Sequence, residues 1–263
     1  MRLNYRLWHK GTALTLAFAL VSLWVGLLTI AQAAPAGEDD IIAFKSVSRS
    51  IHVERCDRGR CAELDWQTLV FQGQPALNQV INRALWALLE NDGSVAQSTT
   101  DKPHRAALND YFQAQAKPGE QIVIQTDLLR QTAQWIVLSV SKYQFEGGAH
   151  GISSARFVNW RVTDSHVVTL EDALLPQARA DYVAALKQAH QRWIAEQRRK
   201  GAIENVSEFV EQWPFETSDD VAFMAEGLRV GYPRYAIAPG SFGEPTLTVP
   251  YSALINVIDP ALF

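Results

Sequence analysis

Three neighbouring segments of alternating polar and apolar residues constrain the fold of this chain more than any other feature. They are QIVIQTDLLRQ (121–131), QWIVLSVSKYQF (134–145) and ISSARFVNWRV (152–162), in which Gln, Thr and Ser alternate with Ile, Val, Trp and Phe. A period of two is typical of strands that cover one face of a sheet. Because only short turns separate the segments, we expect them to pair antiparallel in one sheet.

Helices are predicted on both sides of these strands. Residues 75–91 place their apolar side chains on one helical face, and residues 105–116 indicate a second, shorter helix. After the strands, Thr169 and Asp172 have the spacing of a capping box, which predicts a helical turn. A long helix is then predicted over residues 178–201, with basic residues near its C-terminal end, where the helix dipole favours them.

The last third of the chain adds a small β element. A hairpin is predicted near Glu226 and Gly227, followed by a loop rich in aromatic residues, Pro and Gly, and then by a strand at residues 245–250. This order of elements predicts an α+β protein, with an antiparallel sheet and packed helices. We expect two closely joined halves, at residues 41–140 and 141–263.

The first 33 residues have the plan of a signal peptide. A short basic stretch precedes an uncharged run of about 20 residues, GTALTLAFALVSLWVGLLTI. Ala31 and Ala33 then fit an A-x-A cleavage site, and cleavage after Ala33 is the simplest interpretation. The run is also long enough to span a bilayer, so an uncleaved anchor is the alternative. In both cases we expect the rest of the chain to be exported to the periplasm, with membrane contact only through this segment.

The charge balance argues against a nucleic-acid partner. The net charge is −4, and removal of the leader with Arg2, Arg6 and Lys10 would bring it to −7. An acidic protein lacks the basic face that neutralises phosphates, so no nucleic-acid binding is expected. A cationic partner would suit this charge, although the same charge also serves solubility.

Cys56 and Cys61 are the two cysteines of the chain, and they enclose the tetrapeptide DRGR between alternating segments. Two strands joined by so short a loop bring their Cβ atoms within bridging distance, and an exported protein meets an oxidising compartment. We therefore predict a disulfide at the end of a hairpin. The spacing does not match a C-x-x-C redox motif, and no second cysteine pair is present to build a zinc site.

Three short motifs resemble a known family of exported domains. They are FEGGAHG (145–151), VVTLEDAL (167–174) and EGLRVGYPRYAIAPGSFGEPTLTVPYSAL (226–254). Their order and spacing, over residues 140–258, resemble the extracellular domain shared by the anti-sigma factor RsiV and the non-catalytic region of the peptidoglycan deacetylase PdaC. In RsiV this domain binds lysozyme. The resemblance therefore implies an exported binding or sensor-like module.

The other roles found in that family are not expected here. The anti-sigma role depends on a cytoplasmic sigma-binding segment, and the stretch before the apolar run is too short to supply one. The deacetylase role belongs to a separate domain, whose metal ligands are not found in this sequence. We therefore expect no metal and no cofactor.

The glycine-rich motif admits more than one interpretation. His150 lies among Gly147, Gly148 and Gly151. Glycine permits the positive φ that a sharp connection between strands needs, so we interpret the motif as a turn in which His150 hydrogen-bonds to loop backbone. Contact of His150 and Glu146 with a ligand or partner is a second interpretation. The third is catalysis with Glu146, or with Ser153 or Ser154 as nucleophile, although a glycine-rich turn offers no rigid element to align such groups.

The late loop is a better candidate for binding. Tyr232, Tyr235 and Phe242 lie there among several prolines and glycines, and aromatic side chains on a stiff loop are good anchors at protein or glycan surfaces. The rings could equally fold back over the sheet, and both interpretations stay open. We expect an exported module that recognises a lysozyme-like protein or peptidoglycan and has no chemistry of its own. A cell-envelope hydrolase or deacetylase centred on His150 and Glu146 is the alternative.

Overall fold

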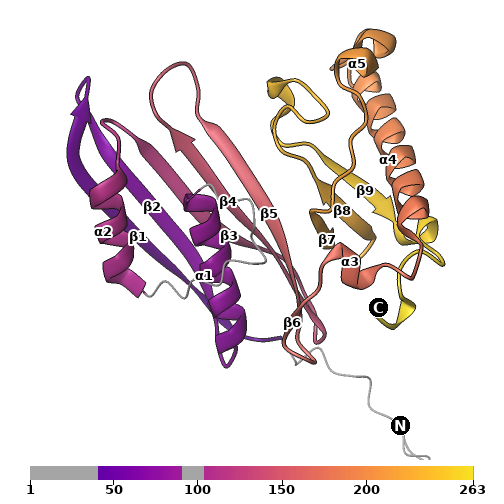
Figure 1. Ribbon diagram of the computed structural model, residues 1–263, viewed down its shortest axis with the longest axis horizontal. Coiled ribbons are helices and arrows are strands. Elements are labelled where there is room, and N and C mark those ends of the chain that lie inside the picture. The colour runs from indigo at the N-terminus through magenta and orange to yellow at the C-terminus, as the bar shows by residue number, and fades with distance from the viewer. Residues whose placement is uncertain (1–40, 91–103, 263) are drawn as a thin grey trace, which may run out of the picture. The chain divides into compact units, whose positions relative to one another are not determined.

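The computed structural model describes residues 41–90 and 104–262 (Figure 1). The leader predicted at residues 1–33 lies outside the described residues. Within them, two sheets follow one another along the chain, and each has its own hydrophobic core. No helix in these two ranges is long and apolar enough to cross a membrane.

The first sheet has six strands within the described residues, and they lie in the order of the sequence. They are β1 (Phe44–Asp57), β2 (Arg60–Phe71), β3 (Gln121–Gln131), β4 (Trp135–Phe145), β5 (Ile152–Arg161) and β6 (His166–Val167). The three alternating segments are β3, β4 and β5, and their antiparallel pairing is confirmed. The predicted disulfide between Cys56 and Cys61 closes the β1–β2 hairpin.

The sheet is mixed, whereas the sequence predicted a wholly antiparallel one. Strands β2 and β3 run parallel, with Glu63 opposite Gln121. The chain between them contains α1 (Pro75–Leu89) and α2 (His104–Gln115). A crossover with helices returns the chain to the sheet in its original direction, which is why this pair is parallel. The α+β class is confirmed.

Helix α1 lies against one face of this sheet and builds the first core (Figure 1). Leu77, Ile81 and Leu85 are buried at helical spacing, as predicted, and belong to one cluster with Leu64 and Ile124 of the sheet. Burial of each such side chain contributes about 1.5–3 kcal/mol. The helical face predicted from the sequence is therefore the face that holds this half together.

The second sheet is antiparallel and has three strands in the described part of the chain. They are β7 (Val221–Phe223), β8 (Gly227–Gly231) and β9 (Thr246–Pro250). The predicted hairpin near Gly227 is the connection between β7 and β8. Helix α4 (Arg179–Arg199) covers this sheet, and its Tyr182 and Leu186 lie in the second core. The long helix predicted from the sequence is thus confirmed.

Shorter helical elements complete the second half. Helix α3 (Leu170–Ala173) has the predicted capping box, because Thr169 Oγ1 accepts from Asp172 N and Asp172 Oδ2 accepts from Thr169 N. Helix α5 (Val206–Gln212), which was not predicted, is capped by the Asn205 side chain. Short 3₁₀ turns occur at Gly240–Phe242, Tyr251–Ala253 and Pro260–Leu262.

Strand β4 contributes to both cores. Leu138 faces the first core, whereas Trp135 and Val137 belong to the second. The boundary predicted between residues 140 and 141 falls inside this strand. Because successive side chains of a strand point to opposite faces, one strand can serve two packing partners.

The second half meets the first sheet at the outer edge of β5. The buried side chain of Asn159 donates to Val221 O at 2.7 Å and accepts from Phe223 N at 2.8 Å, which ties β7 to this edge. Strand β6 pairs with Trp160 and Arg161 at one end of β5. The part of β5 before Trp160 is not paired with β6 and faces the chain segment that leads into β7. The candidate site lies between this part of β5 and that segment.

Candidate binding site

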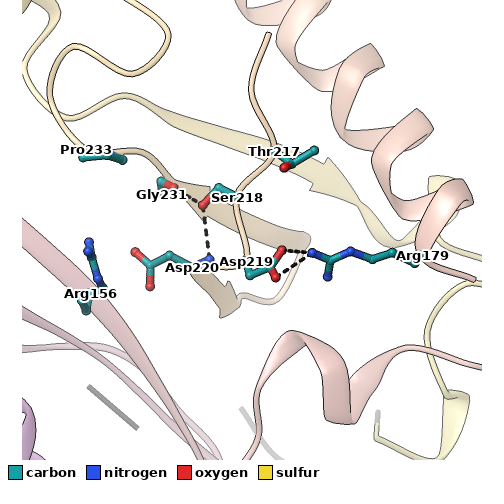
Figure 2. A pocket seen from close by; sticks show the side chains of 8 residues that line it. All are labelled: Arg156, Arg179, Thr217, Ser218, Asp219, Asp220, Gly231 and Pro233. Atoms are coloured by element: carbon teal, nitrogen blue, oxygen red, sulfur yellow. Dashed lines mark hydrogen bonds and ion pairs between the residues drawn. The ribbon is translucent and has the colours of Figure 1, made fainter. Parts of the chain in front are cut away.

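A polar pocket of about 400 Å³ opens where this segment passes β5 (Figure 2). It is lined by Arg156, Arg179, Thr217, Ser218, Asp219, Asp220, Gly231 and Pro233. These residues come from β5, the start of α4, the segment before β7, and the end of β8 with the loop that follows. The fold therefore gathers two guanidinium and two carboxylate groups from distant parts of the sequence.

Asp220 connects the pocket to the edge of β5. Its Oδ1 accepts a hydrogen bond from Phe157 N at 2.9 Å, and its own N–H donates to Ser218 Oγ at 3.2 Å. The Ser218 hydroxyl in turn donates to Gly231 O at 2.6 Å. A Cβ at Gly231 would lie 2.8 Å from Asp220 Oδ2, so glycine leaves the space that this oxygen occupies. One carboxylate oxygen is thus fixed by backbone, and the other borders the pocket.

Asp219 and Asp220 point in opposite directions, each toward a different arginine (Figure 2). Asp219 accepts from Arg179 Nη2 at 2.5 and 2.6 Å. Arg156 Nη1 donates to Ala155 O at 2.8 Å, which anchors its guanidinium on β5, and its charge acts on Asp220. The lining is therefore balanced in charge when both carboxylates are ionised.

The protonation of Asp220 is sensitive to mildly acidic conditions. Burial raises the pKa of Asp220 from 3.8 to about 6, while the Phe157 N–H and the charge of Arg156 oppose the rise. Burial also raises the pKa of Glu244, again against the charge of Arg156. Burial has this effect because removal from water penalises the ionised carboxylate more than the neutral acid.

Two chain segments lead from the pocket to a pair of aromatic rings. They are residues 213–220 before β7 and residues 231–235 after β8, and together we term them the ribbon. At the pocket end Gly231 N donates to Asp220 O at 2.8 Å, and farther along Tyr232 Oη donates to Glu216 O at 2.9 Å. The ribbon is therefore fixed at both positions by hydrogen bonds.

Tyr235 lies at the far end of the ribbon in a strained and exposed position. Its φ is +70°, a value that side chains with a Cβ rarely adopt, and the residue is 52% exposed. Trp213 stacks on it with 6.4 Å between ring centroids. A Cβ at Gly240 would lie 2.5 Å from Tyr235 Oη, so the glycine makes room for the hydroxyl. Strain of this kind costs about 1–3 kcal/mol and persists where the surroundings fix it, often at binding sites.

A family comparison covers most of this site. Residues 172–252 match the family model described as "Protein of unknown function (DUF3298)". This region is a DUF3298 domain. It contains α4, the second sheet and every lining residue of the pocket except Arg156. The DUF3298 domain therefore supplies most of the pocket, and the first sheet completes it.

Two solved structures are similar to the chain over most of its length. A DUF3298 family protein from Pseudomonas aeruginosa PAO1 is 26% identical, with a TM-score of 0.74 and coverage of 86% of this chain and 99% of that chain. A DUF3298 family member from Bacteroides fragilis NCTC 9343 is 14% identical, with a TM-score of 0.59 and coverage of 84% and 96%, which shows the fold alone. No curated protein matches the chain. The comparisons give a domain family for residues 172–252 and a fold for most of the chain, and they give no activity.

The three aromatic residues predicted as anchors differ in their surroundings within the DUF3298 domain. Tyr232 is buried, and Phe242 packs on Trp193 and Phe209 with 5.5 and 5.9 Å between ring centroids. These two residues fold back onto the domain, whereas Tyr235 extends into solvent. The interpretation in which the rings fold back thus holds for Tyr232 and Phe242, whereas a binding contact of Tyr235 stays a prediction.

His150 lies in an exposed turn before the DUF3298 domain. Gly147 and Gly148 have the predicted positive φ, at +97° and +98°, and His150 Nδ1 lies 3.2 Å from the carbonyl oxygen of the next residue. Glu146 Oε1 is 2.7 Å from Lys117 Nζ, in an ion pair. Contact of His150 and Glu146 with a ligand stays a prediction. Over the ranges that the structure describes, no three His, Cys, Asp or Glu side chains are grouped so that they could hold a metal ion.

Arg156, Asp219, Asp220 and Trp213 were not predicted from the sequence as site residues. The two aspartates stand directly before a predicted strand, and that position is a usable signal, because carboxylates beside a strand can accept from an unpaired edge N–H. Trp213 is the C-cap of α5, a short helix that was not predicted and that has no fully buried residue. Arg156 gave no signal, since its role depends on a contact between two sheets.

Proposed function

We propose that this chain is an exported binding or sensor-like module of the cell envelope, which recognises a lysozyme-like protein or a cell-wall glycan and carries out no chemistry of its own. The resemblance of its motifs to the RsiV-like exported domain supports this proposal, since that domain binds lysozyme in RsiV. The predicted leader supports export to the periplasm. If the leader stays uncut, it would hold the module at the inner membrane.

The position of Tyr235 is the observation that carries the proposal. A half-exposed ring that is fixed by Trp213 and Gly240 loses little conformational freedom when a partner covers it. Tyrosine and tryptophan are also the residues that most often dominate binding energy at interfaces. The pocket at the other end of the ribbon adds hydrogen-bond donors and acceptors. A rigid aromatic anchor beside polar groups favours recognition over catalysis.

The hydrolase or deacetylase alternative has weaker support. Besides its ion pair with Lys117, Glu146 accepts a hydrogen bond from Gln144 Nε2 at 2.8 Å. Both contacts engage the same carboxylate oxygen, Oε1, and among the described residues no hydrogen bond joins His150 to Glu146. A general base and the group it serves must lie within hydrogen-bond reach of each other. The pair of His150 and Glu146 is therefore a less suitable centre for hydrolysis than the ribbon is for binding.

Two binding assays test the proposal. The full chain, expressed with its own leader and purified from the cell envelope, would be passed over immobilised lysozyme and sedimented with purified peptidoglycan. We expect retention in at least one assay. Tyr235→Ala should abolish it, whereas Phe44→Ala, which removes an exposed aromatic ring from the opposite edge of the first sheet, should not.

Either of two results would overturn the proposal. The first is no retention in either assay by a protein whose circular dichroism shows that it is folded. The second is turnover of peptidoglycan by the purified chain that His150→Ala abolishes, because that result would establish the enzyme alternative.

A further inference from the structure

We infer that the pocket and the Trp213–Tyr235 pair form one binding site for a neutral sugar chain, with the ring pair as its apolar contact and the pocket as its polar contact. The inference rests on the proposed function and chooses between its two partner classes. It follows from three observations: the charge balance of the pocket, the free hydrogen-bonding groups in it, and the course of the ribbon.

The balance of charge in the pocket favours an uncharged ligand. Arg179 and Asp219 neutralise each other in a two-bond ion pair, and Arg156 and Asp220 add one charge of each sign. A cation in this space would meet two guanidinium groups, and an anion would meet two carboxylates. A neutral polyol avoids both penalties, and each of its hydroxyl groups both donates and accepts hydrogen bonds.

The pocket offers such hydroxyl groups one acceptor and several donors. Asp220 Oδ1 is occupied by Phe157 N, and no donor among the described residues reaches Oδ2. Arg156 also lines the pocket, and among the described residues the one hydrogen bond of its guanidinium is that of Nη1 to Ala155 O. An acetamido or hydroxyl oxygen of a sugar would accept from Arg156, and a hydroxyl proton would go to Asp220. Hydrogen bonds with charged partners are about twice as strong as neutral ones.

The aromatic pair suits the other surface of a sugar ring. One face of a pyranose presents C–H groups, which pack on aromatic rings in the same way as other apolar groups. Tyr235 is 52% exposed, Trp213 stacks on it at 6.4 Å between ring centroids, and the Arg234 guanidinium lies over its ring, 5.3 Å from the centroid. A sugar would therefore pack on the part of the pair that these contacts leave exposed. The φ of +70° at Tyr235 and the fit of its hydroxyl over Gly240 hold this surface in place before any ligand arrives. Such preorganisation increases affinity because little remains to be ordered on binding.

The course of the ribbon favours an extended ligand. Tyr235 and Gly231 are four residues apart along one of its segments, and Trp213 and Asp220 are seven residues apart along the other. A ligand that contacts both the ring pair and the pocket follows this course, and an oligosaccharide has the extended form to do so.

Titration with defined ligands tests the inference. The probe is the β-1,4-linked tetramer of N-acetylglucosamine, added to the full chain in isothermal titration calorimetry, with trilysine and inorganic phosphate as cationic and anionic comparisons. We expect saturable binding of the sugar and at least ten-fold weaker binding of the two ions. Tyr235→Ala and Arg156→Gln should each weaken sugar binding at least ten-fold. Tyr235→Phe should restore most of it, and Phe44→Ala should leave it unchanged.

The outcomes separate this inference from the proposed function. If lysozyme is retained by the full chain but the tetramer does not bind, the sugar site is wrong and the binding module stands. If the tetramer binds equally well to Tyr235→Ala and Arg156→Gln, the sugar site lies elsewhere and the inference fails. If Tyr235→Ala is unfolded by circular dichroism, Arg156→Gln alone decides. If neither lysozyme nor any sugar or peptidoglycan binds, both proposals fail.

Discussion

Replacement of Asp220 by Asn should change how the stability of the protein depends on pH. In the folded chain the carboxyl is partly buried, receives the Phe157 N–H and has a pKa of about 6, whereas its ordinary value is 3.8. Asn has the same shape, and its Oδ1 can still accept from Phe157 N. The variant therefore removes the titration and keeps the hydrogen bond.

The sign of the pH dependence follows from the direction in which folding shifts the pKa of Asp220. Between pH 4 and 6 the folded state holds the Asp220 proton more tightly than the unfolded state does, so the contribution of this group to stability is complete below about pH 4 and is lost as the pH rises through 6. A difference of about 2 pKa units corresponds to about 3 kcal/mol. The free energy of unfolding of the native chain, minus that of Asp220→Asn, should therefore fall by about 2–3 kcal/mol from pH 4 to pH 7.

Urea unfolding followed by tryptophan fluorescence would measure both proteins across this pH range. Asp164→Asn is the matched control, because Arg161 lowers the pKa of Asp164, and its contribution is lost only as the pH falls below the ordinary range of an aspartate. The free energy of unfolding of the native chain, minus that of Asp164→Asn, should thus be nearly constant between pH 5 and 7. A difference for Asp220→Asn that is equally constant would refute the argument that burial controls this carboxyl.

Three further substitutions test the fold around the site. Asn159→Ala should lower the free energy of unfolding by about 2–5 kcal/mol in urea titrations, because it leaves two buried backbone groups at the junction without partners. Cys56→Ser together with Cys61→Ser should cost only about 2 kcal/mol by the same assay, since the disulfide closes a very short loop. Gly227→Ala should cost about 1–3 kcal/mol and lower the melting temperature in calorimetry, because a Cβ there would overlap the backbone of β9. Unchanged stability in any of these variants would contradict the corresponding contact.

The sequence predicted those elements whose signals are local. The alternation in β3, β4 and β5, the apolar face of α1 and the capping box of Thr169 and Asp172 all depend on residues a few positions apart. The parallel pairing of β2 with β3 is different, because two helices separate the strands and no local pattern encodes their direction. Helix α5 was not predicted, because its apolar stripe of Val206, Phe209 and Val210 covers only seven residues and buries none of them fully.

The candidate site was predictable only in part. Tyr235 was visible as an aromatic residue on a stiff loop, yet nothing in the local sequence distinguished it from Tyr232, which is buried. Tyr235 also has a φ of +70°, in a region that local sequence does not lead one to expect for a tyrosine. Arg156 and Asp220 meet across an interface between two sheets, and a single sequence carries no signal for such a meeting.

The contact between Asp220 and Phe157 also bears on how the protein behaves at high concentration. An uncovered strand edge is a template on which a strand of another molecule can add, and long edges of this kind promote aggregation. On β5 the carboxylate of Asp220 takes the place that a carbonyl oxygen of an incoming strand would occupy, and Asn159 engages β7 two residues farther along. The contacts that join the two halves therefore also protect this edge from polymerisation.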